Sequence, residues 1–314
     1  MEQSDNRVIV TENLTKSFGE TVAVNGLDLA VERGEIFGLV GPDGAGKTTT
    51  IRILTAIMLP TSGQATVLGH DTVREAEAIK TDIGYMAQRF NLYRDLTVWE
   101  NLNFFADVFE VTGAERRERI DRLLEFARLT QFKDRRAEHL SGGMQKKLAL
   151  ACTLVHEPKI LFLDEPTTGV DPVSRREFWE ILTDLHIQGI TIFVSTPYMD
   201  EAERCSRVGL LYRGRLTVCD TPERIRQMVE GDLVEVRTAN LKPAREAVTH
   251  MDGVLEVQTY GDLLHVFVDD AGRRMSQMAD GLAEAGITVQ GVRATRPRME
   301  EAFISLIRGM GNGD

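Results

Sequence analysis

Apolar residues follow two spacings along this chain, the alternation that is typical of strands and the longer period of helices. Alternating runs at 8–14 and 21–31, punctuated by glycines, predict a pair of antiparallel strands. A continuous apolar run at 36–40 predicts a buried strand, and a helical pattern runs from Lys47 to Leu59, before Pro60. The chain therefore opens with a strand pair, and a strand, a glycine-rich turn and a helix follow.

The middle of the chain changes to helices and then returns to strands. Helical spacing dominates 97–129, where Thr97 and Glu100 have the spacing of a capping box. We place a helical subdomain at about 90–155. Further elements are predicted as strands at 64–68, 83–86, 160–163 and 190–194, a helix at 172–186, and a hairpin at 208–218 that turns at Arg213 and Gly214. Strands that alternate with helices indicate an α/β core, to which the first strand pair adds an antiparallel β subdomain.

A second, smaller pattern begins after Thr221 and Pro222. Its predicted strands are 233–237, 254–258, 263–268 and 287–292, and its predicted helices are 244–251, 273–285 and 299–307. This order suggests a compact α+β appendage. We therefore expect two domains, 7–229 and 230–314.

Charge and composition narrow the classes of partner. The 314 residues carry a formal net charge of -11, so no broad positive field would attract nucleic acid. Cys152, Cys205 and Cys219 show neither pairing nor metal-ligand spacing, which fits a reduced, cytoplasmic setting. No apolar run approaches the roughly 20 residues that cross a bilayer, and residues 1–6 are unlike a secretory signal. We expect any membrane association to come through a partner.

A glycine-rich segment between the predicted strand at 36–40 and the helix that follows matches the P-loop pattern. Its glycines let successive N–H groups surround phosphates, and the helix N-terminus adds partial positive charge. Lys47 would contact the β- and γ-phosphates of ATP, and Thr48 would offer its hydroxyl to Mg²⁺. The expected nucleotide-binding residues of this segment are Gly41, Pro42, Asp43, Gly44, Ala45, Gly46, Lys47, Thr48 and Thr49. This context predicts a P-loop NTPase (RecA-like) core.

Two carboxylates end the apolar strand predicted at 160–163. Asp164 would hold Mg²⁺ through water, and Glu165 would polarise the attacking water as general base. Two acids after a strand usually belong to a loop or a helix cap. Because these two follow a P-loop in the same chain, we favour the catalytic interpretation.

The segment Leu140–Gln145 reads Leu-Ser-Gly-Gly-Met-Gln and resembles the signature motif of ABC ATPases. Ser141 and the N–H groups of Gly142 and Gly143 would stand at the start of a helix that runs to Val155, which makes a second anion site. The resemblance implies that this helix points at the γ-phosphate held by a second ATPase subunit. Without the resemblance, Ser-Gly-Gly would be an ordinary turn.

Three further landmarks of the family appear in order. Phe18 resembles the aromatic residue that stacks on adenine, although a lone aromatic is more often a core residue. Gln88 resembles the glutamine that touches Mg²⁺ and the catalytic water, although singly it would be a surface residue. Asp171 resembles the residue that reaches across the dimer, although Asp-Pro is also a common helix start. The resemblance extends from about Val8 to Val229.

One landmark is missing, because Pro197 stands where the family places a histidine. Proline has no side-chain donor and no N–H, so it cannot bond the γ-phosphate. We hypothesise normal binding of Mg-ATP and slow hydrolysis, unless Thr196, Tyr198 or a partner residue supplies the donor. The alternative is that Glu165 suffices.

The segments 41–46, 198–203 and 299–304 resemble those of type-II ABC exporter ATPases. This implies a homodimer or heterodimer with a second ATPase subunit and a separate integral membrane permease, at the cytoplasmic face of the inner membrane. The apolar segment 91–111, after Gln88, is expected to be helix core or the groove for the permease. Alternatives are a non-catalytic ATP switch and a soluble ABC protein that acts on ribosomes or DNA. The chain shows neither a second cassette nor a coiled-coil insertion.

Overall fold

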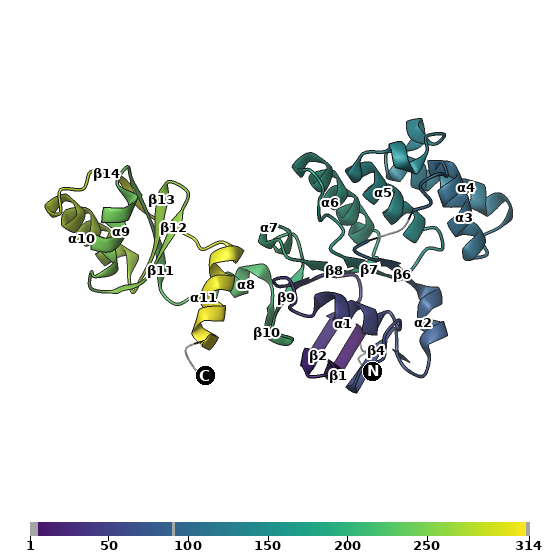
Figure 1. The fold of residues 1–314 in the computed structure, drawn as a ribbon, viewed down its shortest axis with the longest axis horizontal. Coiled ribbons are helices and arrows are strands. Elements are labelled where there is room, and N and C mark those ends of the chain that lie inside the picture. The colour runs from purple at the N-terminus through teal and green to yellow at the C-terminus, as the bar shows by residue number, and fades with distance from the viewer. Residues whose placement is uncertain (1–5, 90–91, 312–314) are drawn as a thin grey trace. The chain divides into compact units, whose positions relative to one another are not determined.

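The computed structural model describes residues 6–89 and 92–311, and it divides the chain into two compact units, one up to Thr221 and one from Pro222 (Figure 1). The boundary expected between 229 and 230 was therefore placed too late. Helix α8 (Pro222–Gln227), which the sequence pattern did not predict, packs against α11 (Met299–Gly311) and so belongs to the second unit.

The first unit opens with the predicted antiparallel β subdomain. Its strands are β1 (Arg7–Phe18), β2 (Thr21–Glu32), β4 (Ser62–Val67) and β5 (His70–Asp71). They form a sheet in the order β2-β1-β4-β5, in which every neighbouring pair is antiparallel. Residues 9, 14, 24, 27 and 31 of β1 and β2 are buried. The buried positions change parity where the pairing of the two strands shifts register, between Thr11 and Leu14 and between Leu14 and Lys16.

A six-stranded sheet in the order β10-β9-β3-β8-β7-β6 forms the centre of the first unit. Its strands are β3 (Ile36–Val40), β6 (Ile83–Met86), β7 (Ile160–Asp164), β8 (Thr191–Thr196), β9 (Arg207–Tyr212) and β10 (Arg215–Asp220). All neighbours are parallel except the β9–β10 hairpin. Every residue of β3, β7 and β8 is buried, because both faces of this sheet are covered.

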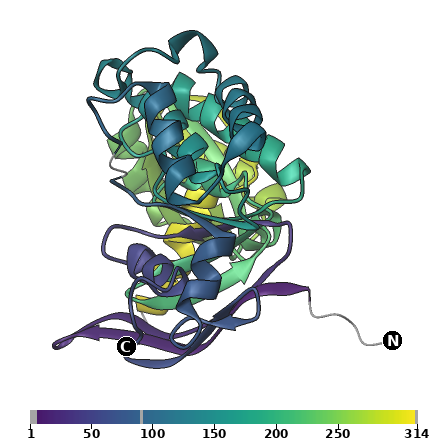
Figure 2. The same cartoon turned by 90° about the vertical axis from the view of Figure 1, so that its right-hand side faces the viewer.

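Helix α1 (Lys47–Leu54) and the β subdomain cover one face of the six-stranded sheet, where Ile51, Phe162 and Phe193 share a core (Figures 1 and 2). Figure 1 shows α5 (Gly142–Thr153) and α6 (Pro172–Ile187) on the opposite face. Helix α1 ends at Leu54, earlier than the predicted Leu59. Ala56 has a φ of 56°, and this left-handed conformation cannot continue a right-handed helix.

The helical subdomain contains α3 (Val98–Val108), α4 (Gly113–Phe126) and α5, with the short 3₁₀ turns η1 (Thr130–Phe132) and η2 (Ala137–His139). Residues 90 and 91, at the start of the predicted subdomain, lie outside the described residues. The predicted capping box is present, because the Thr97 side chain accepts from the N–H of Glu100 and the Glu100 side chain accepts from the N–H of Thr97. Two short helices of the first unit, α2 (Ala76–Asp82) and α7 (Met199–Ala202), were not predicted.

The second unit has a βαββαβ order, and its sheet follows the sequence β12-β13-β11-β14 with all neighbours antiparallel. This is the ferredoxin-like arrangement. Its elements are β11 (Asp232–Thr238), α9 (Leu241–Thr249), β12 (Val254–Tyr260), β13 (Leu263–Val268), α10 (Ala271–Glu284) and β14 (Val289–Thr295), with α8 and α11 added. Val236, Leu264 and Leu282 lie in a core of its own.

Because the second unit has its own core, it should be possible to weaken it selectively. Leu264 is fully buried, so Leu264→Ala should lower the free energy of unfolding of this unit by about 2 to 5 kcal/mol. Both tryptophans of the chain, Trp99 and Trp179, lie in the first unit. In urea, the far-UV circular dichroism should therefore show an earlier transition while the tryptophan fluorescence transition stays in place. A shift of the fluorescence transition alone would contradict the separate core.

Candidate nucleotide-binding site

The carboxyl ends of three parallel strands, β3, β8 and β7, meet at one edge of the six-stranded sheet. Val40 pairs with Thr196 and Asp164 pairs with Ser195 across the strands. At this edge the N–H of Gly41 donates to the Thr196 carbonyl at 3.4 Å. The sheet register therefore places the glycine-rich loop, the carboxylates of Asp164 and Glu165 and the loop that contains Pro197 side by side.

The loop between β3 and α1 has a backbone that other residues could not adopt. Gly46 has a φ of 108°, and a Cβ there would lie 2.2 Å from the carbonyl oxygen of Ala23. A Cβ on Gly41 would lie 2.1 Å from the carbonyl oxygen of Leu211. The Lys47 ammonium donates to the carbonyls of Gly41 at 2.8 Å and Pro42 at 3.1 Å. The loop thus curls around a buried cation, as a phosphate-binding loop requires.

Glu165 is the counter-ion of Lys47. Its Oε1 lies 3.2 Å from the Lys47 Nζ, and both side chains are buried. Its Oε2 accepts from Gln88 Nε2 at 2.8 Å and from the Thr168 hydroxyl at 3.3 Å. Glu165 therefore contacts both of the other predicted catalytic residues, Lys47 and Gln88. A phosphate that binds Lys47 must compete with the Glu165 carboxylate for the same ammonium.

Asp164 is arranged to receive a cation. Its Oδ1 accepts from the hydroxyls of Thr48 at 3.0 Å and Ser195 at 2.7 Å, while its buried Oδ2 has no hydrogen-bond partner among the described residues. Burial raises the pKa of Asp164, because desolvation disfavours the ionised carboxylate. A hard divalent cation beside Oδ2 and the Thr48 hydroxyl would give Oδ2 a partner and would favour the ionised form of Asp164, opposite to the effect of burial. The residues present therefore fit Mg²⁺.

The backbone of Glu165 is held in the left-handed region, with a φ of 48°. This conformation is unfavourable for a residue with a side chain. The Glu165 N–H donates to both the carbonyl (3.1 Å) and the hydroxyl (3.0 Å) of Ser195, and these bonds fix it. Sequence reasoning did not single out Ser195, because its position beside the two carboxylates follows only from the parallel pairing of β7 and β8.

The signature segment forms the start of α5. The Ser141 side chain accepts from the N–H of Met144 at 3.3 Å as the N-cap of that helix. Ser141 and Gly142 are exposed, whereas Gly143 is buried, and a Cβ there would lie 2.4 Å from Ser174 Cβ. The N-terminal end of α5 is therefore accessible to a second molecule. A pocket of about 370 Å³ beside it includes Gln88 and Gly142 in its lining.

Lys146, on the second turn of α5, was not predicted as a site residue. Its ammonium donates to the Gln88 carbonyl at 3.1 Å. Burial lowers the pKa of Lys146, although the nearby Asp164 and Glu165 oppose that shift. Helix α5 is thus linked directly to the glutamine that contacts Glu165.

Phe18 and Asp171 occupy exposed positions of the first unit. Phe18 is 50% exposed at the end of β1, so it is not a core residue, and the Lys16 ammonium lies 5.2 Å from its ring centroid. Asp171 caps α6 by accepting from the N–H groups of Val173 and Ser174. These hydrogen bonds lower the pKa of Asp171, and the bond from the Ser174 N–H has the largest effect. The contacts of both residues with a nucleotide or a second chain stay predictions.

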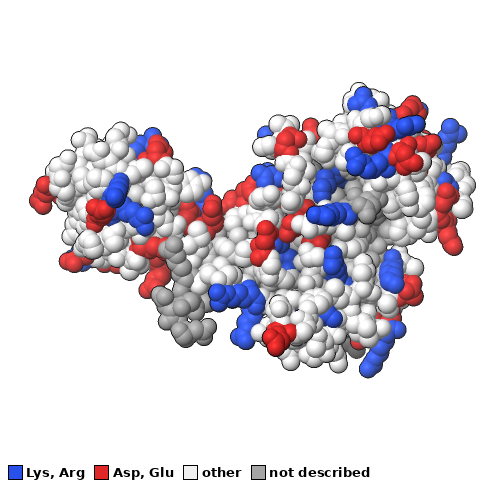
Figure 3. All heavy atoms as spheres, viewed as in Figure 1, with Lys and Arg blue, Asp and Glu red and all other residues white. Residues whose placement is uncertain are grey.

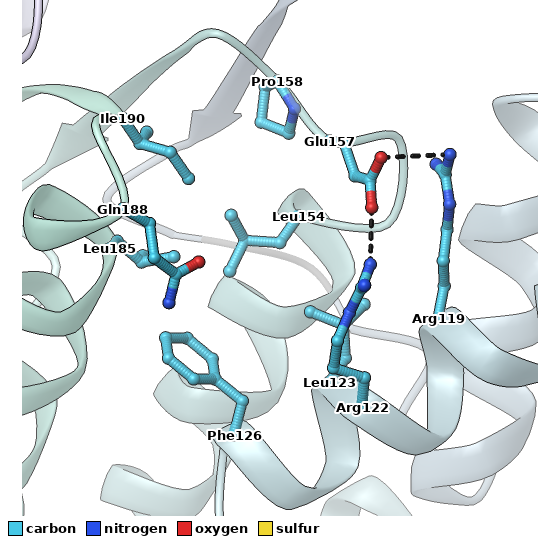
Figure 4. A pocket seen from close by; sticks show the side chains of 10 residues that line it. All are labelled: Arg119, Arg122, Leu123, Phe126, Leu154, Glu157, Pro158, Leu185, Gln188 and Ile190. Carbon is cyan, nitrogen blue, oxygen red and sulfur yellow. Dashed lines mark hydrogen bonds and ion pairs between the residues drawn. The ribbon is translucent and has the colours of Figure 1, made fainter.

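A separate apolar pocket of about 350 Å³ lies between α4, the end of α5 and the end of α6 (Figure 4). Leu123, Phe126 and Leu154 contribute to its wall, and Glu157 binds the guanidinium groups of Arg119 and Arg122 at one end. None of the predicted nucleotide-binding residues lines it. Figure 3 shows acidic and basic side chains interspersed on the visible face of each unit, without a continuous basic surface there.

Comparison with known proteins places the chain in a family. A family model described as ABC transporter matches residues 24–168. The chain is 42% identical over 315 residues to the probable multidrug ABC transporter ATP-binding protein YbhF of Escherichia coli. The aligned region covers 98% of this chain and 53% of that protein. This chain therefore spans about half the length of that relative.

Two other relatives match over most of both chains. The daunorubicin resistance ATP-binding protein DrrA2 of Streptomyces coeruleorubidus is 36% identical, with 96% of this chain and 95% of that protein covered. The Nod factor export ATP-binding protein I of Cupriavidus metallidurans is 38% identical, with 83% and 86% covered.

Solved structures give the same result. That of cbiO1 from Clostridium perfringens, part of the ABC transporter complex cbiONQ, has a TM-score of 0.66 and 28% identity, and covers 71% of this chain and 92% of that chain. A dimeric ATP-binding cassette, MJ0796, bound to ADP and Pi, has a TM-score of 0.62 and 29% identity, with 68% and 98% covered. The chain belongs to the family of ABC transporter ATP-binding proteins, and the expected P-loop NTPase fold is confirmed.

The Ser195 hydroxyl should influence the cation site without touching the cation. Ser195→Ala removes a donor to Asp164, so the Mg²⁺ concentration needed for half-maximal binding of a fluorescent ATP analogue should rise about tenfold. Ser206→Ala is the matched control, because Ser206 accepts from the N–H of Ile36, at the opposite end of β3. Equal Mg²⁺ requirements in both variants would contradict the role of Ser195.

Proposed function

We propose that this chain is the ATP-binding and ATP-hydrolysing subunit of an ABC exporter, which dimerises around two Mg-ATP and drives a separate membrane permease. One observation carries the proposal: Lys47, Glu165 and Gln88 form a contact cluster at the P-loop, while the signature end of α5 stays exposed. The names of the relatives, which concern multidrug transport, daunorubicin resistance and Nod factor export, support the export direction.

The chemistry follows from the contacts that ATP would replace. The N–H groups of the P-loop and Lys47 bind the phosphates, and Glu165 loses its counter-ion. Gln88, which bonds Glu165 directly, can then orient that carboxylate toward water. Glu165 accepts the water proton as the bond from the water oxygen to the γ-phosphorus forms, and the bond from that phosphorus to the β-phosphate oxygen breaks, so that ADP and phosphate are the products. Asp164 and Thr48, which bond each other, would hold Mg²⁺, and that ion would supply positive charge that neutralises the phosphates.

A second ATPase subunit is needed because one chain supplies only part of the phosphate environment. Ser141 and Gly142 at the start of α5, and Asp171 at the start of α6, are exposed polar positions of the first unit. A helix N-terminus with exposed N–H groups is suited to an anion presented by another molecule. The partner is either a second copy of this chain or a related ATPase subunit.

The membrane partner would dock near Gln88. Tyr93 and Phe104 are 44% and 36% exposed, and their ring centroids lie 4.4 Å apart. Residue 91 of the predicted apolar segment lies outside the described residues. In the described part of the chain, no helix is both long and apolar enough to span a bilayer. We infer that this aromatic surface receives a permease helix, which would hold the subunit at the cytoplasmic face of the inner membrane.

A slow ATP switch is the second candidate, and Pro197 favours it. The N–H of Tyr198 donates to the Thr196 hydroxyl, and that hydroxyl donates to Glu201. The Tyr198 ring lies against the Arg175 guanidinium. The Thr196 hydroxyl, one of the expected substitutes for the histidine donor, is therefore already bonded to Glu201.

Pro197→His should restore a donor to the transferred phosphate. We expect steady-state ATP hydrolysis to rise about 10²- to 10³-fold, while ATP affinity stays the same, because Lys47 and the P-loop are unchanged. The assay compares the purified proteins at saturating Mg-ATP, and Glu165→Gln in both backgrounds is the control that removes the base. Equal rates with proline and histidine would show that Glu165 suffices.

A further inference from the structure

Glu201 of α7 carries a buried carboxylate that lies outside the P-loop and the two acidic positions after β7. The residue is 1% exposed. Its Oε1 accepts from the Thr167 hydroxyl at 2.5 Å and its Oε2 accepts from the Thr196 hydroxyl at 2.7 Å. A buried carboxylate is costly, and these hydrogen bonds to an acceptor-only group are what make it tolerable.

The two threonines belong to different loops of the site. Thr196 ends β8, and its carbonyl accepts from the N–H of Gly41 at the start of the P-loop. Its hydroxyl also accepts from the N–H of Tyr198 at 3.0 Å, which closes the turn around Pro197. The P-loop, the end of β8 and the turn at Pro197 are therefore joined through one residue.

Thr167 lies on the other side of the carboxylate, in the segment between Glu165 and α6. Its carbonyl accepts from the N–H of Val170 at 3.1 Å, next to Asp171, the N-cap of α6. Thr168, its neighbour, donates to Glu165 at 3.3 Å. Glu201 thus links the end of β8, which bonds the start of the P-loop, to the loop expected to face a second subunit.

We propose that Glu201 is a positioning residue that fixes the P-loop side of the site and the Thr167–Asp171 loop in one arrangement through the hydroxyls of Thr196 and Thr167. This inference rests on the proposed function. With Pro197 in place of a donor, the end of β8 contributes no bond to phosphate from residue 197. The end of β8 then contributes to catalysis through the position that Glu201 gives the neighbouring loops. This matters because a small displacement of the reacting groups lowers the rate strongly.

The substitution Glu201→Gln tests this arrangement with little change in shape. An amide has one acceptor oxygen, so one threonine hydroxyl loses its acceptor and meets an N–H₂ group. We expect the turnover of ATP to fall about tenfold or more. ATP affinity should change little, because Lys47 and the P-loop N–H groups stay in place. Glu203→Gln, the same substitution at an exposed position two residues away, is the matched control and should leave turnover unchanged.

Thr167 provides a conservative rescue. Thr167→Val keeps the shape and removes the donor, so it should reproduce the loss of turnover, whereas Thr167→Ser keeps the hydroxyl and should restore it. Thermal unfolding of each variant shows whether the fold is retained. A fall in melting temperature with unchanged turnover in Glu201→Gln and Thr167→Val would overturn the proposal, since a merely structural carboxylate would behave in that way.

A readout that does not depend on hydrolysis separates this inference from the proposed function. In a Glu165→Gln background, size-exclusion chromatography with Mg-ATP should show a dimer. Adding Glu201→Gln should reduce the fraction of protein in the dimer, although the amount of ATP bound per chain stays the same. If the dimer fraction is the same with and without Glu201→Gln, the inference is wrong and the function stands. If the parent protein binds no ATP, the proposed function itself is wrong.

Discussion

The parallel register of β3, β8 and β7 is the constraint on which the site depends. It brings the P-loop, Ser195 and the carboxylates of Asp164 and Glu165 to one edge of a sheet that is buried on both faces. A strand that is buried on both faces must be mostly apolar along its length, so the polar residues of the site lie at the ends of these strands. The β subdomain and α1 then complete the core against one face of this sheet.

Within that frame, the contact of Lys47 with Glu165 links nucleotide binding to catalysis. The Glu165 carboxylate, which is proposed to activate water, is paired with the Lys47 ammonium, which should bind phosphate. Glu165 therefore becomes available to activate water only when ATP takes its place beside Lys47. Gln88 and Thr168 hold the other carboxylate oxygen, so its release changes the environment of two neighbouring loops at once. Site chemistry and loop position are therefore coupled through a few short contacts.

Local patterns predicted much of this structure. Periodicity predicted every strand described except the two-residue β5, and most long helices. The glycine-rich loop was found from its spacing and its place between a strand and a helix. Periodicity did not reveal that α1 stops at Leu54, because a left-handed Ala56 leaves no compositional signal. Ser195, Lys146 and Glu201 were missed for another reason: each bonds a residue that is distant in sequence, namely Asp164, Gln88 and Thr167, and only the sheet register and packing bring them together.

The central claim is that one chain holds two half-sites that serve different nucleotides. Mixing two inactive variants tests it most directly, one with Lys47→Ala in the P-loop and one with Ser141→Arg at the exposed start of α5. The account predicts that each variant alone hydrolyses almost no ATP and that the mixture recovers activity, because a mixed dimer pairs the intact P-loop of one chain with the intact signature of the other. If both variants fold and bind to each other but their mixture stays inactive, the two half-sites do not meet across a dimer and the account is contradicted.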